Sequence, residues 1–169
     1  MINFLIRLLL PITFIVIPLI TQRNINIRKK LGFKEKICFK KEFKTSLKYL
    51  GILILFGISW SALFYLFGWS RGQADFNMNP LLLLLFILIG SFSEEVFFRG
   101  FIQKKTNLLT SAFLFGIFHV GHGSLYQVIG AFFMGIIFGW EYKKTKGITA
   151  CFLSHFMYNL FAFIPFLIM

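Results

Sequence analysis

The sequence predicts an all-α fold, a polytopic transmembrane helix bundle with about six spans. Hydrophobic residues make up 57% of the 169 residues, and charged residues only 14%. The mean hydropathy is +0.77. A soluble domain typically has about 25% charged residues. The apolar excess must therefore face lipid, which excludes a soluble enzyme, a disordered chain and a disulfide-stabilised scaffold.

Six apolar stretches are candidate spans, since a span needs about 20 residues and sometimes as few as about 17. They cover residues 4–20, 47–69, 80–102, 107–120, 125–140 and 148–167. Pro80 opens the third stretch, and proline is tolerated in the first turn of a helix. The length predicts one integral membrane domain, 1–169. Within it, 80–169 carries the polar motifs and 21–46 forms a basic loop.

The net charge of +12 comes mainly from three connecting segments. Nine basic residues lie in 23–44, two follow the third stretch (Lys104 and Lys105), and three follow the fifth (Lys143, Lys144 and Lys146). These segments alternate along the chain, so the positive-inside rule places all three in the cytoplasm. We therefore expect the charge to set topology on a lipid bilayer, and expect no nucleic-acid partner. Loop 21–46 either contacts anionic lipid or is simply solvated.

The third stretch contains Glu94, Glu95 and Arg99 in an otherwise apolar helix. Ionisable residues inside spans are costly and are functional candidates by default. Glu95 and Arg99 are four residues apart, so they share a helix face and can pair. Glu94 points about 100° away around a regular helix, which makes it the candidate for chemistry. A carboxylate shielded from water can act as a general base near neutral pH.

Two further stretches carry polar residues at a similar predicted depth. His119 ends the fourth, while His155 and Asn159 lie four apart in the sixth. Counted from the nearest lysine at about 1.5 Å per residue, Glu94, His155 and His119 lie about 15, 13 and 21 Å deep. We therefore expect one polar catalytic pocket between spans three, four and six. His122 is expected at its rim.

This set of side chains suits two chemistries. Glu94 and His119 could activate a water while His155 and Asn159 stabilise an oxyanion. Alternatively, Glu94, His119 and His155 could hold a divalent metal such as zinc. The spacing does not separate a metal-free site from a zinc site. A purely structural polar cluster or a proton relay would also account for these residues.

Three motifs resemble those of the CPBP family of intramembrane endopeptidases, which includes the type 2 CAAX prenyl proteases and the bacterial Abi proteins. They are Glu94-Glu95-Val96-Phe97-Phe98-Arg99, Phe115-Gly116-Ile117-Phe118-His119 and His155-Phe156-Met157-Tyr158-Asn159. The resemblance covers residues 80–169. It implies that Glu94 and His119 activate the attacking water. It also implies that His155 and Asn159 form the oxyanion site, with Glu95, Arg99 and Phe115 as structural support.

The resemblance further implies an intramembrane endopeptidase acting on a peptide or membrane-protein substrate, of either glutamate type or metalloprotease type. With six spans the chain is shorter than the prenyl proteases, so a role in bacteriocin processing or self-immunity is expected in preference to prenyl-protein processing. The expected location is a bacterial cell membrane, with several spans and cytoplasmic basic loops. The alternative is a non-enzymatic membrane immunity or binding protein with a structural polar cluster.

Overall fold

The structure, a computed structural model, describes residues 2–22, 26–67, 79–120 and 124–168, and its regular elements within these ranges are all helices. The predicted helical membrane bundle is therefore confirmed. The elements are α1 (Ile2–Thr21), α2 (Ile27–Lys30), α3 (Phe39–Leu66), α4 (Pro80–Glu94), η1 (Glu95–Gln103), α5 (Leu108–Phe118), α6 (Leu125–Thr145) and α7 (Ile148–Ile168).

Each predicted span corresponds to an apolar helical segment. Three segments are long and apolar enough to cross a membrane by length and composition: Phe39–Leu66, Pro80–Gln103 and Leu125–Thr145. Three others are apolar but shorter in the described part of the chain: Leu9–Thr21, Leu108–Phe118 and Ile148–Phe163. Many of the large hydrophobic side chains on these helices are exposed on the molecular surface, as expected for side chains that face lipid.

Residues 26–46, within the predicted basic loop 21–46, include helical segments. They contain the four-residue helix α2, and α3 already begins at Phe39. Lysine and glutamate are good helix formers, so the polar stretch after Cys38 can continue the apolar helix beyond the membrane. Glu42, in the first turn of α3, is buried and forms an ion pair with Lys34. This pair holds Lys34 against the start of α3.

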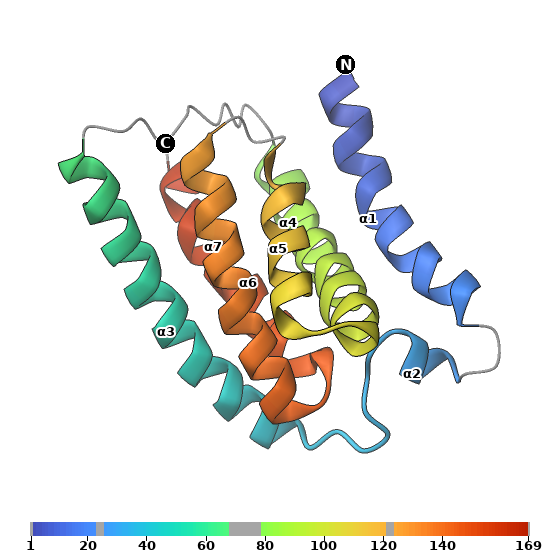
Figure 1. The fold of residues 1–169 in the computed structure, drawn as a ribbon. Coiled ribbons are helices and arrows are strands. Elements are labelled where there is room, and N and C mark those ends of the chain that lie inside the picture. The colour runs from blue at the N-terminus through green and yellow to red at the C-terminus, as the bar shows by residue number, and fades with distance from the viewer. Residues whose placement is uncertain (1, 23–25, 68–78, 121–123, 169) are drawn as a thin grey trace.

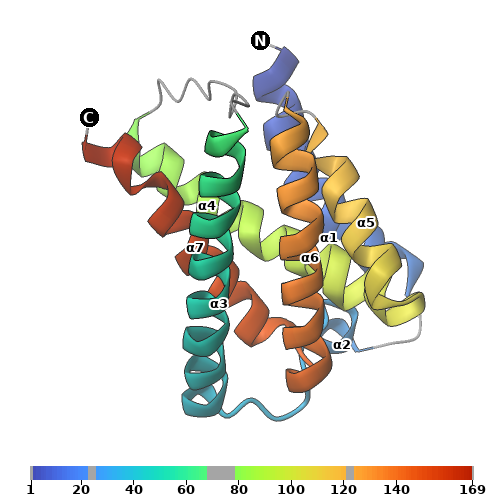
Figure 2. The ribbon, with the colours of Figure 1, turned by 60° about the vertical axis from the view of Figure 1, so that its left-hand side comes forward.

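The helices cross at two inclinations. In Figure 2, α4 and α7 run obliquely behind the more upright α3 and α6. In Figure 1, α1 lies at the edge of the bundle, and the connection between α6 and α7 lies at the same end as α2. We call this end, formed by residues 26–38, 104–107 and 143–147, the basic end. It gathers segments that the charge pattern placed on one membrane side.

Small residues bring α5 and α6 into close contact. A Cβ added to Gly135 of α6 would lie 3.0 Å from Cα of Ala112 on α5. One added to Gly116 of α5 would lie 3.0 Å from the carbonyl oxygen of Val128 on α6. Within lipid, helix association depends on such close packing, because the tails are as apolar as the side chains. The contact places the end of α5, and with it His119, beside α6.

Gly32 joins the basic end to the bundle. Its φ of 85° lies in the left-handed region, and a Cβ there would lie 2.6 Å from Cα of Gly100 in η1. Its carbonyl oxygen accepts a hydrogen bond from the backbone N–H of Ile148 at 3.2 Å. One residue thus contacts the start of α7 and the middle of η1, where no side chain fits.

We expect Gly32→Ala to destabilise the protein, because it adds a backbone clash to a left-handed conformation that costs an alanine about 1–2 kcal/mol. Gly51→Ala is the matched control. Gly51 has open space around its Cβ position in α3, so alanine should stabilise that helix by up to about 1 kcal/mol. A thiol-reactive dye that labels buried Cys151 on unfolding, in a Cys38→Ser background, would measure both melting temperatures. Equal melting temperatures for the two variants would contradict this role of Gly32.

Candidate functional site

The helix that carries the two adjacent glutamates changes its type between them. The α-helix α4 ends at Glu94, and the π-helix η1 begins at Glu95. A π-helix closes its hydrogen bonds between residues i and i+5, which redistributes side chains around the axis, and such segments are frequent at functional sites. The apolar pattern of 80–102 indicated one regular helix. The change of type is therefore a feature that the sequence pattern did not predict.

Glu95 is fully buried and contacts two partners with its two oxygens. Nδ1 of His155 donates to Oε1 at 2.8 Å, and Oε2 lies 3.3 Å from Nε of Arg99. The ion pair expected between Glu95 and Arg99 is therefore present. In addition, Glu95 orients an imidazole on α7. This contact gives the residue a direct part in the geometry of the site, beyond the supporting role that the resemblance implied.

Arg99 ties η1 to α6. Its side chain is fully buried, and Nη2 donates to the carbonyl oxygen of Gly135 at 3.2 Å. The centre of its guanidinium lies 4.5 Å from the ring centroid of Phe115 and 5.2 Å from that of Phe138. An arginine buried among apolar helices needs such compensation, since aromatic faces attract the cation and Glu95 balances its charge.

Glu94 approaches the other nitrogen of the same imidazole. Its Oε2 lies 3.8 Å from Nε2 of His155, which is longer than a direct hydrogen bond. The Glu94 side chain is 24% exposed, whereas the His155 side chain is only 6% exposed. The His155 ring stacks on Phe138, with centroids 4.6 Å apart. His155 is thus held between two carboxylates, of which only Glu94 is partly open.

His119 follows the last residue of α5 and lies beside the same aromatic cluster. Its Nδ1 is 2.7 Å from the carbonyl oxygen of Phe115. A carbonyl oxygen can only accept, so Nδ1 carries the hydrogen, and Nε2 of the neutral ring is a hydrogen-bond acceptor. The Phe115 ring lies 4.7 Å from the His119 ring and 6.0 Å from the His155 ring. Phe115 therefore packs against both histidines and against Arg99.

Asn159 lies one turn beyond His155 on α7 and contacts α4. Its Nδ2 donates to Oγ of Ser91 at 3.1 Å. Ser91 is buried and precedes Glu95 by four residues, so the two side chains lie on one face of α4 and its continuation. Ser91 was not among the candidates selected from the sequence. The sequence feature that could have identified Ser91 is its position four residues before Glu95. This spacing equals that between His155 and Asn159, the residues that they contact on α7.

The structure thus brings Glu94, Glu95, His155 and Asn159 together across α4, η1 and α7, and places His119 against the same phenylalanine as His155. Beyond Ser91 it shows a buried acid on α6, Glu141, which accepts from Oγ of Ser154 at 2.6 Å. Glu141 lies one residue beyond the fifth predicted span, 125–140. His122 lies outside the described residues.

In the described ranges, no group of three His, Cys, Asp or Glu side chains is arranged to hold a metal ion. Nδ1 of His155 donates to Glu95, and Nδ1 of His119 donates to the carbonyl oxygen of Phe115. A metal-binding histidine commonly donates its second ring N–H in this way, so Nε2 of each ring is the nitrogen that would face a metal. A metal held by Glu94, His119 and His155 therefore stays a prediction.

Comparison with known proteins places this chain in a family. The family model described as type II CAAX prenyl endopeptidase Rce1-like matches residues 76–161, about half of the chain. A Bacillus subtilis protein named Putative membrane peptidase YdiL is 31% identical over 125 residues, covering 64% of this chain and 49% of that protein. An uncharacterized protein of Mycoplasma capricolum is 32% identical over 96 residues, covering 53% of this chain and 29% of that protein.

The chain therefore spans half or less of the length of these curated relatives. No solved structure matches it. The matched region, 76–161, contains all three sequence motifs and the polar contacts described above.

We expect Glu95→Gln to destabilise the protein by about 3–5 kcal/mol, because it leaves the buried Arg99 without a balancing charge. Glu94→Gln should change stability much less, since Glu94 is partly exposed and lies 3.8 Å from its imidazole partner. Melting temperatures of the two variants, measured by labelling of Cys151, would test the difference. Equal decreases in melting temperature for the two variants would contradict this structural role of Glu95.

Proposed function

Because the chain belongs to the family of type II CAAX prenyl endopeptidase Rce1-like proteins, we propose that it is an intramembrane endopeptidase that hydrolyses a peptide bond near the bilayer. The observation that carries the proposal is the imidazole of His155 between the carboxylates of Glu95 and Glu94, at 2.8 and 3.8 Å. A buried acid fixes the ring on one side, and a partly open acid faces it on the other. The ring is thereby held in one orientation beside Glu94, and groups held in place before the reaction are what a hydrolytic site needs.

Glu94 is the proposed general base. Oε2 of Glu94 lies 3.8 Å from Nε2 of His155, and a polar separation of more than about 3.5 Å is one that a water molecule can bridge. As the water oxygen bonds to the scissile carbonyl carbon, one proton passes to Glu94. The acceptor nitrogen Nε2 of His119 is proposed to orient that water. When the tetrahedral intermediate collapses, the C–N bond breaks and Glu94 returns the proton to the leaving amine.

His155 and Asn159 are the proposed oxyanion donors. The amide of Asn159 has two N–H groups, of which one donates to Ser91, and the other can donate to a carbonyl oxygen. Because Nδ1 of His155 already donates to Glu95, Nε2 can donate to the same carbonyl oxygen only when the ring is an imidazolium, with a hydrogen on both nitrogens. Donors fixed before the reaction stabilise developing charge strongly in a site shielded from water. Ser91 and Glu95 act as positioning residues for the two donors.

The substrate is proposed to be a peptide or a membrane protein that enters from the bilayer, and the location a bacterial cell membrane with the basic end in the cytoplasm. The charge pattern and the origin of both relatives in bacteria support this location. A role in bacteriocin processing or self-immunity is supported by the sequence motifs alone. A non-enzymatic immunity protein is the competing function.

We expect Glu94→Gln to lower the cleavage rate by about 10²–10⁴-fold, the typical contribution of a general base. The assay would use purified protein in liposomes with quenched fluorescent transmembrane peptides and, in parallel, a farnesylated CAAX peptide. Glu35→Gln is the matched control, because Glu35 is an exposed acid paired with Lys29 outside the site. Full cleavage by Glu94→Gln would refute the mechanism. Protection against a bacteriocin by this variant, without cleavage, would favour the competing function.

We also expect removal of divalent metals with a chelator to leave the cleavage rate unchanged, because the proposed steps use only side-chain acids, bases and donors. The rate should be measured before and after exhaustive dialysis against the chelator, with the metal content determined by elemental analysis. Loss of activity that returns with added zinc would overturn the metal-free mechanism.

A further inference from the structure

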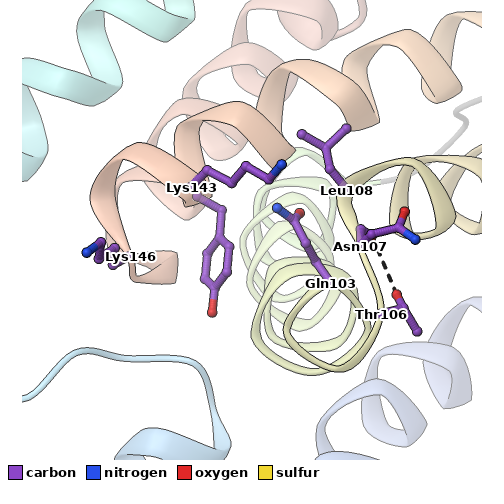
Figure 3. Close-up of a pocket in the computed structure, with 7 residues that line it drawn as sticks. Gln103, Thr106, Asn107, Leu108, Lys143 and Lys146 are labelled. Carbon is purple, nitrogen blue, oxygen red and sulfur yellow. Dashed lines mark hydrogen bonds between the residues drawn. The ribbon is translucent and has the colours of Figure 1, made fainter.

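A pocket at the basic end is separate from the catalytic residues. It has a volume of about 430 Å³ and is lined by Gln103, Thr106, Asn107, Leu108, Tyr142, Lys143 and Lys146. Figure 3 shows that it lies where the end of η1, the start of α5 and the end of α6 meet. Its size falls within the roughly 300–1,000 Å³ of small-molecule sites. Glu95 is at the opposite end of η1, so this pocket serves another purpose.

The wall of the pocket is positively charged. Lys143 and Lys146 line it, and none of its lining residues is acidic. Lys146 ends α6 with a φ of 55°, in a turn closed by its N–H donating to the carbonyl of Tyr142 at 2.7 Å. This turn places two lysines of one helix end on the pocket, while Lys144 between them does not line it. The α5 N-terminus, at Asn107 and Leu108, adds the positive end of an eleven-residue helix.

The floor of the pocket is polar and fixed. Gln103 is only 7% exposed, and its Nε2 donates to the carbonyl oxygen of Gly139 at 2.9 Å. Within the described part of the chain, its Oε1 has no hydrogen-bond partner. This oxygen is shielded from solvent and packs toward Gly139 of α6, so Gln103 is a fixed neutral side chain that adds no negative charge to the pocket. Figure 3 shows the Gln103 side chain between Lys143 and Asn107.

The pocket lies at the level where the membrane spans end. Gln103 is the last residue of the candidate span Pro80–Gln103, and Thr145 ends the candidate span Leu125–Thr145. The lipid headgroups begin where the apolar spans end. Lysines at that level attract anionic lipids, with about 1 kcal/mol for each basic residue near the surface.

We propose that this pocket binds the phosphate of an anionic phospholipid headgroup. Lys143 and Lys146 pair with the phosphate, and the start of α5 contributes the positive end of its helix dipole. Phosphatidylglycerol has a net negative charge. Phosphatidylcholine carries its phosphate with a cation, so it fits the positively charged wall poorly. The bound lipid joins the ends of η1 and α6.

The test is calorimetric titration of the purified full chain in detergent with short-chain phosphatidylglycerol, short-chain phosphatidylcholine and inorganic phosphate. We expect phosphatidylglycerol to bind at least tenfold more tightly than phosphatidylcholine. Lys143→Gln and Lys146→Gln should each weaken its binding about fivefold. Lys144→Gln is the matched control on the same turn, and should bind like the unchanged protein. Melting temperatures would verify that all three variants are folded.

Equal binding of the two lipids would overturn the proposal. So would a loss in Lys144→Gln as large as in Lys143→Gln, since diffuse surface charge would then explain the binding. Inorganic phosphate that binds as tightly as phosphatidylglycerol would assign the pocket to free phosphate and overturn the lipid assignment.

Discussion

The burial of Glu95 with Arg99 and His155 is the constraint on which the rest of this bundle depends. A carboxylate, a guanidinium and an imidazole lie among helices whose other contacts are mainly apolar, and each would be costly there alone. Together they compensate one another: Glu95 faces Arg99 at 3.3 Å and accepts from His155 at 2.8 Å. The three residues belong to η1 and α7, so satisfying them fixes how these helices cross.

The same network extends to the remaining elements of the core. Arg99 donates to the backbone of α6 and lies against the rings of Phe115 and Phe138. Those rings in turn pack on His155, and Phe115 also packs on His119. Apolar helices in lipid have little hydrophobic drive to associate, so polar contacts and close packing decide their arrangement. Here the groups that specify the packing are neighbours of the groups proposed to perform the chemistry.

Two other buried acids, Glu141 and Glu42, also have polar partners. Glu141 accepts from Ser154 between α6 and α7, and Glu42 pairs with Lys34 beside the start of α3. Both lie toward the basic end, where the spans leave the apolar layer. Polar pairs therefore connect helices both near their ends and near their centres. Many of the large side chains on the outer surface are apolar. Glu94 differs from these acids, because its side chain is 24% exposed.

The sequence by itself determined the helical class, the order of the apolar segments and the polar residues worth examining. These follow from composition and from local spacing along one helix, as with Glu95 and Arg99, and local spacing is fixed by helix geometry. The tertiary structure alone decided that both glutamates reach His155, that Ser91 holds Asn159 and that Gln103 forms the floor of a basic pocket. These contacts join residues 36 to 68 positions apart, or depend on the change from α- to π-helix after Glu94. Their geometry comes from how whole helices pack, which no short pattern records.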